Sequence, residues 1–252
     1  MNVTALTNLA IAAYRPEQLR RIVKADGHTN PVGSANAKTA TPSTYRPVGD
    51  TCPTSCPQFP RAGEHTSCLA LSGNVALHQK RALPLWQSSV RAAIIAMVGA
   101  ARWGNPARLH VSGDFFLPDG VTLDEQYIGA LSDAANIVKQ HFKATWVAWT
   151  YTHATPEQFG FWRERFVEVG IALRFSGQPG DWGALVTDSK TPGAEARRLG
   201  ATYCPEQAAA DVGKSVTCVE CTLCWTRSRS ILFRPSNGAR PNPDTGEHRE
   251  GT

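Results

Sequence analysis

The chain has 252 residues, 42% of them hydrophobic, and a net charge of +5. This length suits one large domain with its own core, or such a domain with a small appendage, and the mild positive charge permits a nucleic-acid partner without requiring one. The longest apolar run, residues 92–101, is about half of what a bilayer requires, which excludes a membrane partner. The N-terminal segment lacks the features of a signal peptide, so we expect a cytoplasmic protein.

The predicted elements begin with a helix over residues 5–23 and an irregular segment over residues 25–67 that is rich in Gly, Pro, Ser and Thr. Strands and helices then alternate. Strands are expected at residues 108–112, 145–151, 171–176, 182–187 and 201–203, and helices at residues 84–103, 123–142, 156–169 and 192–199. Thr155 is the expected N-cap of the third of these helices, and Gly200 the expected end of the fourth.

This alternation is typical of βα units around a parallel sheet. We therefore expect an α/β fold, either a partial (βα) barrel or an open parallel sheet, since about four or five units fall short of the eight in a complete barrel. It would occupy residues 1–203, including an N-terminal cysteine loop at residues 50–70. A cysteine-rich metal-binding segment at residues 204–235 and a disordered tail at residues 236–252 would follow.

The seven cysteines form an early and a late cluster, with none in the long stretch between them. The odd number argues against a fully disulfide-paired framework, and in a reducing compartment clustered thiols are more often metal ligands. The early cluster consists of Cys52, Cys56 and Cys68, and the late cluster of Cys204, Cys218, Cys221 and Cys224.

The two clusters differ in their number of thiols. The late one offers four, which zinc and iron–sulfur clusters both accept, and its two consecutive two-residue gaps favour iron–sulfur. The early one offers three. Either His65 completes a zinc site there, or one position of an iron–sulfur cluster stays open for a small molecule, as in catalytic metal centres. In both clusters, the alternative is that cysteines are simply packed.

Polar residues are expected at the carboxyl ends of the strands, where parallel α/β folds bind their ligands. Asp114 is the strongest candidate there, because the preceding turn should expose its carboxylate. Arg174 lies within an apolar strand and would be costly to bury unpaired, so it should meet Asp114 or a substrate anion, or else end at the surface of an edge strand. His110 is either catalytic or a core histidine. The strand-end set is Ser112, Asp114, Tyr151, His153, Ser176 and Cys204.

Aromatic residues near these strands offer two interpretations. They could form a surface on which a base stacks, although side chains of this kind more often belong to a core. The set is Phe115, Phe116, Trp146, Trp149 and Trp162.

Three cysteines followed by βα units and a further cysteine cluster resemble the radical S-adenosylmethionine enzymes. Cys52 and Cys56 match the first gap of that family's Cys-x3-Cys-x2-Cys loop, whereas the gap to Cys68 is longer and Ser67 replaces the usual aromatic residue. The family's Gly-Gly-Glu-like motif at the end of its second strand corresponds in place to residues 112–114.

The resemblance implies a [4Fe–4S] cluster on the early cysteines, with an open iron that binds S-adenosylmethionine, and an auxiliary cluster on the late cysteines. It implies reductive cleavage of this cofactor and radical chemistry on a substrate. The residues expected to contact the cofactor are Ser112, Gly113, Asp114, Tyr151 and Ser176, and those expected to be catalytic are Asp114, His110 and Arg174.

A second resemblance, over residues 35–225, is to uncharacterised phage-encoded proteins. It rests on the Thr-Cys-Pro-x2-Cys loop at residues 51–56, the His-Val-Ser-Gly-Asp-Phe segment at residues 110–115 and the Trp-Thr-Tyr-Thr strand at residues 149–152. It implies location in the host cytoplasm.

Two other functions fit the same residues. In one, both metals are zinc and the chain modifies nucleic acid. In the other, both sites are structural and the chain is a nucleic-acid-binding or host-interaction module. Contact with phosphate would fall to the basic residues near the end of the chain, Arg227, Arg229, Arg234 and Arg240.

Overall fold

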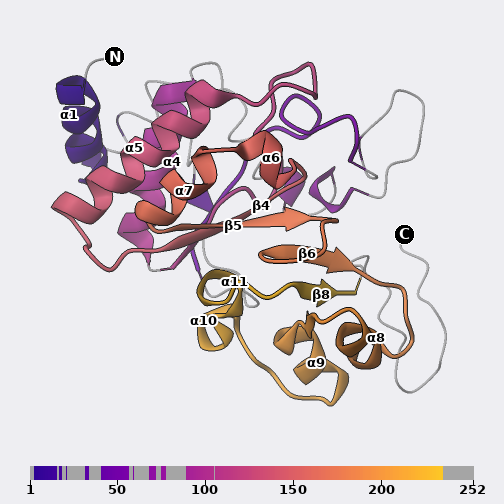
Figure 1. The fold of residues 1–252 in the computed structure, drawn as a ribbon. Helices are drawn as coiled ribbons and strands as arrows, with labels where there is room; N and C mark the ends of the chain where they lie inside the picture. The colour runs from indigo at the N-terminus through magenta and orange to yellow at the C-terminus, as the bar shows by residue number, and fades with distance from the viewer. Residues whose placement is uncertain are drawn as a thin grey trace.

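The structure, a computed structural model, describes residues 3–15, 17–18, 21, 32–33, 41–56, 59, 68–71, 75–77, 89–104 and 106–234. Its centre is an eight-stranded sheet of order β1-β2-β3-β4-β5-β6-β8-β7 (Figure 1). The first pair, β1 with β2, is antiparallel, and all the other pairs are parallel. The expected α/β fold with a parallel sheet is confirmed, and within the described residues the sheet is open.

Most strands are short. β4 and β5 pair along five residues and form the centre of the sheet. The strands are β1 (Val32–Gly33), β2 (Ser43–Thr44), β3 (Ala107–Arg108), β4 (Ala148–Thr152), β5 (Ile171–Ser176), β6 (Gly183–Val186), β7 (Thr202–Tyr203) and β8 (Ile231–Phe233).

Two features describe how the chain runs through the sheet. From β2 to β6, each strand lies beside the strand that follows it in the chain, so the parallel part is wound in one direction. β8 then enters between β6 and β7, pairing with both. The segment that carries the late cysteines therefore ends inside the main sheet.

Helices cover both faces of the sheet. α4, α5 and α7 lie on one side of β4 and β5, with α1 beside α4, whereas α10 and α11 lie on the other side (Figure 1). The helices are α1 (Val3–Tyr14), the short 3-10 helix η1 (Leu69–Leu71), α4 (Ser89–Trp103), α5 (Glu125–His141), α6 (Pro156–Phe159), α7 (Trp162–Glu168), α8 (Pro192–Arg198), α9 (Pro205–Asp211), α10 (Cys218–Cys221) and α11 (Leu223–Thr226).

Local sequence explains the helices that enclose the core. α5 starts at Asp124, whose side chain accepts a hydrogen bond from the Tyr127 backbone, and it buries Ile128, Leu131 and Val138 at helical spacing. In α4, residues 93–101 are apolar apart from a glycine and are buried, as the sequence predicts. Thr155 caps α6 in a reciprocal capping box, as expected.

Two predicted elements differ from the structure. The strand expected at residues 108–112 ends at Arg108, because His110 has a positive φ of 51° that no continuing strand accommodates. The helix expected at residues 156–169 is divided into α6 and α7 at Gly160, whose φ is 51°. Parts of two predicted helices, residues 84–88 and most of residues 16–23, lie outside the described residues, as does the tail at residues 236–252.

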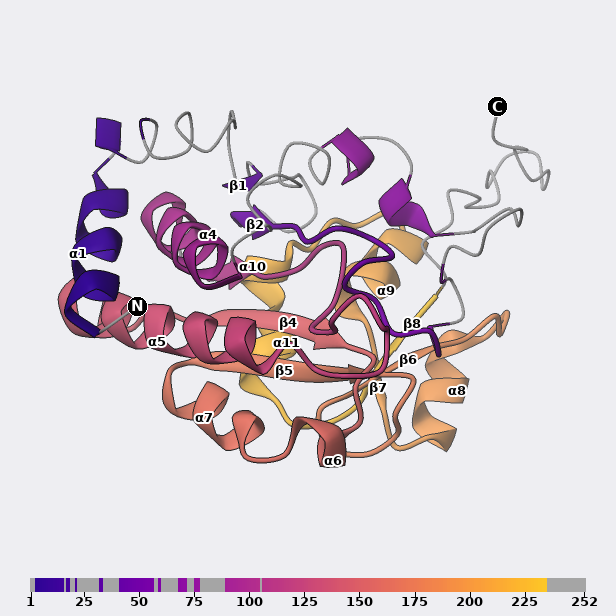
Figure 2. The ribbon, with the colours of Figure 1, turned by 90° about the horizontal axis from the view of Figure 1, so that it is seen from above.

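The carboxyl ends of neighbouring strands meet where the expected site should lie. Figure 2 shows the chain that leaves β2 running towards the ends of β4 and β5. Backbone hydrogen bonds join these segments: Arg46 N donates to the Ser112 carbonyl, and Val111 N donates to the Thr44 carbonyl. The described helices include none long and apolar enough to cross a membrane.

Arg174 joins the late cysteine segment to the sheet. Its guanidinium is fully buried and donates to the carbonyl oxygens of Cys224 (3.1 Å), Leu223 (2.8 Å) and Arg229 (2.9 Å), and also to that of Arg227. The structure therefore shows neither the expected carboxylate partner nor a surface position. Backbone carbonyls stabilise the buried charge, and Arg174 holds α11 and the residues after it against β5.

We expect Arg174→Met to lower the free energy of unfolding by about 3 kcal/mol or more, because several buried carbonyls lose a charged donor. Urea denaturation measures this change. Arg197→Met is the matched control, since Arg197 is exposed on α8, and it should change stability by less than about 0.5 kcal/mol. Equal losses in the two variants would contradict the anchoring role.

Candidate functional site

The carboxylate of Asp114 is buried among hydrogen-bond donors. Its Oδ1 accepts from the backbone N–H of Phe115 (2.8 Å) and from the hydroxyl of Thr152 (2.6 Å). Its Oδ2 accepts from the backbone N–H of His153 (2.8 Å) and lies 3.2 Å from Nδ1 of the same histidine. Only 2% of Asp114 is exposed. The prediction that the turn exposes this carboxylate is wrong, because the end of β4 supplies donors that enclose it.

The Ser112-Gly113-Asp114 turn is hydrogen-bonded to the residues that lead into the early cysteine loop. The Ser112 hydroxyl donates to the Arg46 carbonyl (2.9 Å), and the Asp114 N–H donates to Oγ1 of Thr51 (3.1 Å). Gly113 has a φ of +73°, and a Cβ there would lie 2.8 Å from the Arg46 carbonyl oxygen. Only glycine allows so close an approach between the two segments.

Arg46 connects this turn to the core. It donates to the Asp114 carbonyl (2.7 Å) and to Oδ2 of Asp124 (2.8 Å), and its guanidinium lies 3.9 Å from the centre of the Tyr127 ring. The Tyr127 hydroxyl is 2.7 Å from Nε2 of His110. Burial, with a smaller contribution from the Arg46 charge, lowers the pKa of His110 well below its usual value. The structure thus places His110 in the core, as a neutral and hydrogen-bonded histidine.

One of the early cysteines, Cys52, lies within electrostatic range of Asp114 at this edge of the sheet. Burial and, to a smaller extent, the charges of Asp114, Cys56 and Cys68 raise the pKa of Cys52 to about 12. Burial likewise raises the pKa of Cys68, and the charge of Cys56 acts in the same direction. Each of these thiols therefore lies within electrostatic range of another. Three thiolates that lie near one another repel each other, and a bound cation would remove this unfavourable electrostatic energy.

His153 connects the early cysteines to Asp114. It directly follows β4, and 37% of its side chain is exposed. Burial disfavours its charged form, but hydrogen bonds to Asp114 and Cys56 and the charges of both groups outweigh this effect and raise the pKa of His153 to about 10. Asp114, His153 and Cys56 thus form a chain of contacts from a buried carboxylate to a half-buried thiol.

The late cysteines are divided between a face of the sheet, where α11 carries Cys224 against β4 and β5, and the end of β7, which Cys204 follows. The Cys224 sulfur is 3.2 Å from the Tyr151 hydroxyl. Burial raises the pKa of Cys224, and electrostatic interaction with Cys221 acts in the same direction. Burial, together with Cys224, raises the pKa of Tyr151 well above its usual value. Cys204 follows β7, just before α9, and α10 lies beside α9.

All seven cysteines belong to the described part of the chain, and each is a thiol rather than half of a disulfide. Across the described ranges, no three His, Cys, Asp or Glu side chains already lie close enough together to hold a metal ion.

The remaining candidates separate into core and surface. Phe115, Phe116, Trp146 and Trp149 are buried, and Trp162 packs against the same core, so they do not form an exposed stacking surface. Ser176 ends β5 at the expected edge and is half-buried. Arg46, Thr51 and Thr152 belong to the site although the sequence analysis did not select them. Thr152 precedes His153, so the strand-end rule could have identified it.

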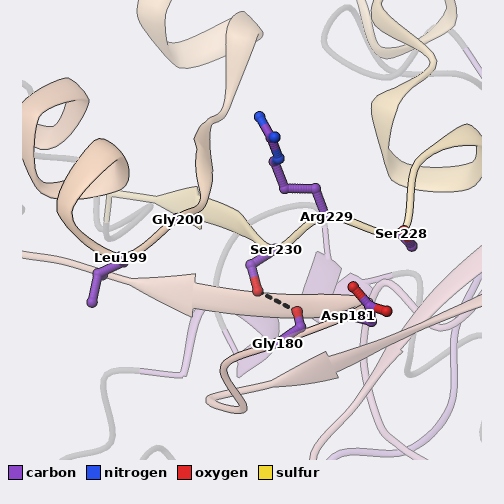
Figure 3. Close-up of a pocket in the computed structure, with 7 residues that line it drawn as sticks. All are labelled: Gly180, Asp181, Leu199, Gly200, Ser228, Arg229 and Ser230. Atoms are coloured by element: carbon purple, nitrogen blue, oxygen red, sulfur yellow. Dashed lines mark hydrogen bonds between the residues drawn. The ribbon is translucent and has the colours of Figure 1, made fainter.

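A hollow of about 280 Å³ lies at the opposite edge of the sheet (Figure 3). Its residues precede β6, β7 and β8, so they lie at the amino ends of the strands, and the Ser230 hydroxyl donates to the Gly180 carbonyl across it. Ligands of parallel sheets bind at the other edge. The hollow is lined by Gly180, Asp181, Leu199, Gly200, Ser228, Arg229 and Ser230.

Comparison of the chain with protein-family models, with curated proteins and with solved structures gives no match.

We expect Gly113→Ala to lower the free energy of unfolding by about 2–4 kcal/mol, because it combines a positive φ with a steric clash against backbone. Gly177→Ala is the matched control: its φ is +76°, and nothing lies within 4 Å of the added Cβ. The free energy of unfolding of this control should fall by only about 1–2 kcal/mol, because only the backbone conformation is unfavourable for alanine there. Thermal or urea unfolding of both variants tests whether contact with Arg46 and Thr51 constrains the turn.

His110 should make stability depend on pH. Because the folded protein holds its pKa below 6.5, the unfolded chain takes up the proton first as the pH falls. The stability associated with neutral His110 is fully present above pH 6.5 and is lost as the pH decreases below that value. We expect His110→Asn to reduce the difference in unfolding free energy between about pH 7.5 and about pH 5.5.

Proposed function

We propose that this chain is an iron–sulfur enzyme similar to the radical S-adenosylmethionine enzymes, with its catalytic centre at Cys52, Cys56 and Cys68. The observation that carries the proposal is the position of these thiols. They follow the first strand of the parallel sheet, and Cys52 lies within electrostatic range of Asp114 in the Ser112-Gly113-Asp114 turn, which follows the second strand.

The fold supports this proposal. Strands β2 to β6 follow one another in chain order across the open sheet, and this winding is the one that the wall of a partial (βα) barrel would have. A cysteine loop after the first parallel strand and an acidic turn after the second correspond to the layout of the radical S-adenosylmethionine enzymes.

The donor types suit a cluster, although the described side chains do not lie close enough together to hold a metal as they stand. Three cysteines outside any disulfide are the kind of ligand that a four-iron cluster with one open iron requires. When bound, such a cluster would pass one electron from an external reductant to S-adenosylmethionine and cleave it.

The residues around the thiols have defined tasks in this proposal. Asp114 orients His153 and joins β3 to β4, and the Ser112 hydroxyl fixes the chain that leads into the loop. Because the Asp114 carboxylate is enclosed, it acts as a positioning residue in our proposal, whereas the exposed part of His153 faces the cofactor and substrate. Ser176 lies at the same edge and is available for contact with the cofactor.

The late cysteines would hold an auxiliary cluster. Cys221 and Cys224 lie within electrostatic range, and α10, which carries Cys218 and Cys221, lies beside α9, which follows Cys204. Tyr151 would donate its hydroxyl proton to the Cys224 sulfur. Because Arg174 donates to carbonyls of the same segment, this second site would be fixed against the sheet.

A second candidate is a zinc protein that modifies or binds nucleic acid. Arg227 and Arg229 favour it, because both are exposed in the segment after α11 while their backbone carbonyls are fixed by Arg174. A basic surface on a rigid backbone suits contact with phosphate. In this candidate the same thiols would bind zinc.

Anaerobic purification followed by metal analysis tests the proposal. We expect a brown protein that contains iron and absorbs at about 400 nm. Cys56→Ala should lose the iron of the early site, whereas Ser55→Ala, an exposed neighbour in the same loop, should retain it. A colourless protein with stoichiometric zinc would reject the iron–sulfur function and support the second candidate. A protein without bound metal would reject both.

A further inference from the structure

We infer that Arg108 and Ser43 bind a phosphate-type oxyanion on the face of the sheet that carries α11. The two residues belong to neighbouring parallel strands, β3 and β2. Neither is part of a cysteine cluster, so this site goes beyond the proposed function and does not depend on it.

The strand register places both side chains on one face of the sheet. Ser43 is the partner of Arg108, and Arg108 is the partner of Trp149. Partners on adjacent parallel strands lie about 4.8 Å apart and point to the same side. The centre of the Trp149 ring is 4.6 Å from that of Trp225 in α11, which identifies the side. Arg108 and Ser43 are therefore neighbours on the α11 side.

Polar atoms of these side chains lack hydrogen-bond partners among the described residues. Ser43 is 1% exposed, and its hydroxyl oxygen has no partner within that part of the chain. Nε of Arg108 is likewise buried and unpaired there. The same holds for the hydroxyl of Thr41, two residues before Ser43 and also 1% exposed. Buried polar groups without partners are unfavourable, so three of them in two adjacent segments point to a ligand that pairs with them.

Arg108 also carries a charge that no carboxylate of the described residues neutralises. Its guanidinium lies 5.6 Å from the centre of the Tyr151 ring, which is a cation–π contact. By contrast, Arg46 pairs with Asp124, and Arg174 donates to backbone carbonyls. Arg108 is half-buried, so part of its side chain is open to solvent and an anion can reach it.

A phosphate group fits these donors and this position. A guanidinium presents its N–H groups in a planar fork that matches the oxygens of an oxyanion, and a hydroxyl can donate one hydrogen bond more. Arg108 is the last residue of β3, so the site lies near the carboxyl end of that strand. Parallel α/β folds bind their ligands at such ends. The phosphate can be a free ion or part of a nucleotide, since both present the same oxygens.

Isothermal titration calorimetry of the full-length protein tests the site, with inorganic phosphate, adenosine monophosphate and adenosine as separate probes. We expect the wild type to bind phosphate or adenosine monophosphate but not adenosine. Tighter binding of the nucleotide than of inorganic phosphate would identify a nucleotide ligand, whereas binding of inorganic phosphate alone would identify the free ion. Arg108→Gln should weaken the binding about tenfold or more, because charge-assisted hydrogen bonds are lost, and Ser43→Ala about threefold to tenfold.

Two further variants serve as controls. Arg197→Gln, on the exposed face of α8, removes one positive charge and should keep the wild-type affinity. Arg108→Lys keeps the charge but loses the planar fork, so it should bind with intermediate affinity, and it replaces the glutamine variant if that variant is unstable. In phosphate-free buffer, Ser43→Ala should unfold at the same urea concentration as the wild type, because its hydroxyl has no partner within the described residues.

Four results would overturn the inference. The first is the absence of binding heat with both phosphate and adenosine monophosphate. The second is wild-type affinity in both Arg108 variants, which would place the bound anion elsewhere. The third is equal weakening by Arg197→Gln and Arg108→Gln, which would show an effect of net charge only. The fourth is a clear loss of stability in Ser43→Ala without phosphate, which would show that the hydroxyl is bonded within the protein.

Discussion

The buried carboxylate of Asp114 is the interaction on which the rest of the site depends. It accepts hydrogen bonds from its own turn, from Thr152 and from His153, so it joins the segment after β3 to the end of β4. Arg46 donates to the carbonyl of the same residue and thereby ties in the segment after β2. Three consecutive strand ends therefore meet at one residue, Asp114, through its side chain and its backbone carbonyl.

This arrangement fixes a sheet edge whose strands are short. β2 and β3 are only two residues long each, and their pairing alone could not fix the chain between them. Side-chain hydrogen bonds replace the missing ladder: Thr44 accepts from His110, and Thr51 accepts from Asp114. The position of the early cysteine loop thus depends on a buried polar network. Burial of these polar groups costs less free energy than burial of unpaired ones, because each of them has a hydrogen-bond partner.

Much of the fold could be predicted from the sequence. The extents of β5, α5 and α8 follow from apolar periodicity and capping residues, and these elements lie close to the expected ranges. The end of β3 could not be predicted, because it depends on a positive φ at His110, a residue that ordinarily continues a strand. The division between α6 and α7 at Gly160 depends in the same way on one backbone angle.

The site was harder to predict than the fold. The strand-end rule selected Asp114 and His153 correctly by position, but it gave no information on which of them is enclosed. The partners of Arg174 were also beyond sequence reasoning, since they are carbonyls of residues that lie about 50 positions further along the chain. Contacts with backbone leave no pattern in the side chains of the partner segment.

The insertion of β8 between β6 and β7 has a consequence for how this chain acquires its structure. β7 pairs with β8 and not with β6, so it is synthesised before the strand that it needs as a neighbour. During translation, residues 202–203 must wait until residue 233 has left the ribosome, and the late cysteines lie in the interval. β7 can therefore join the sheet only after the late cysteine segment has folded back and placed β8 beside β6.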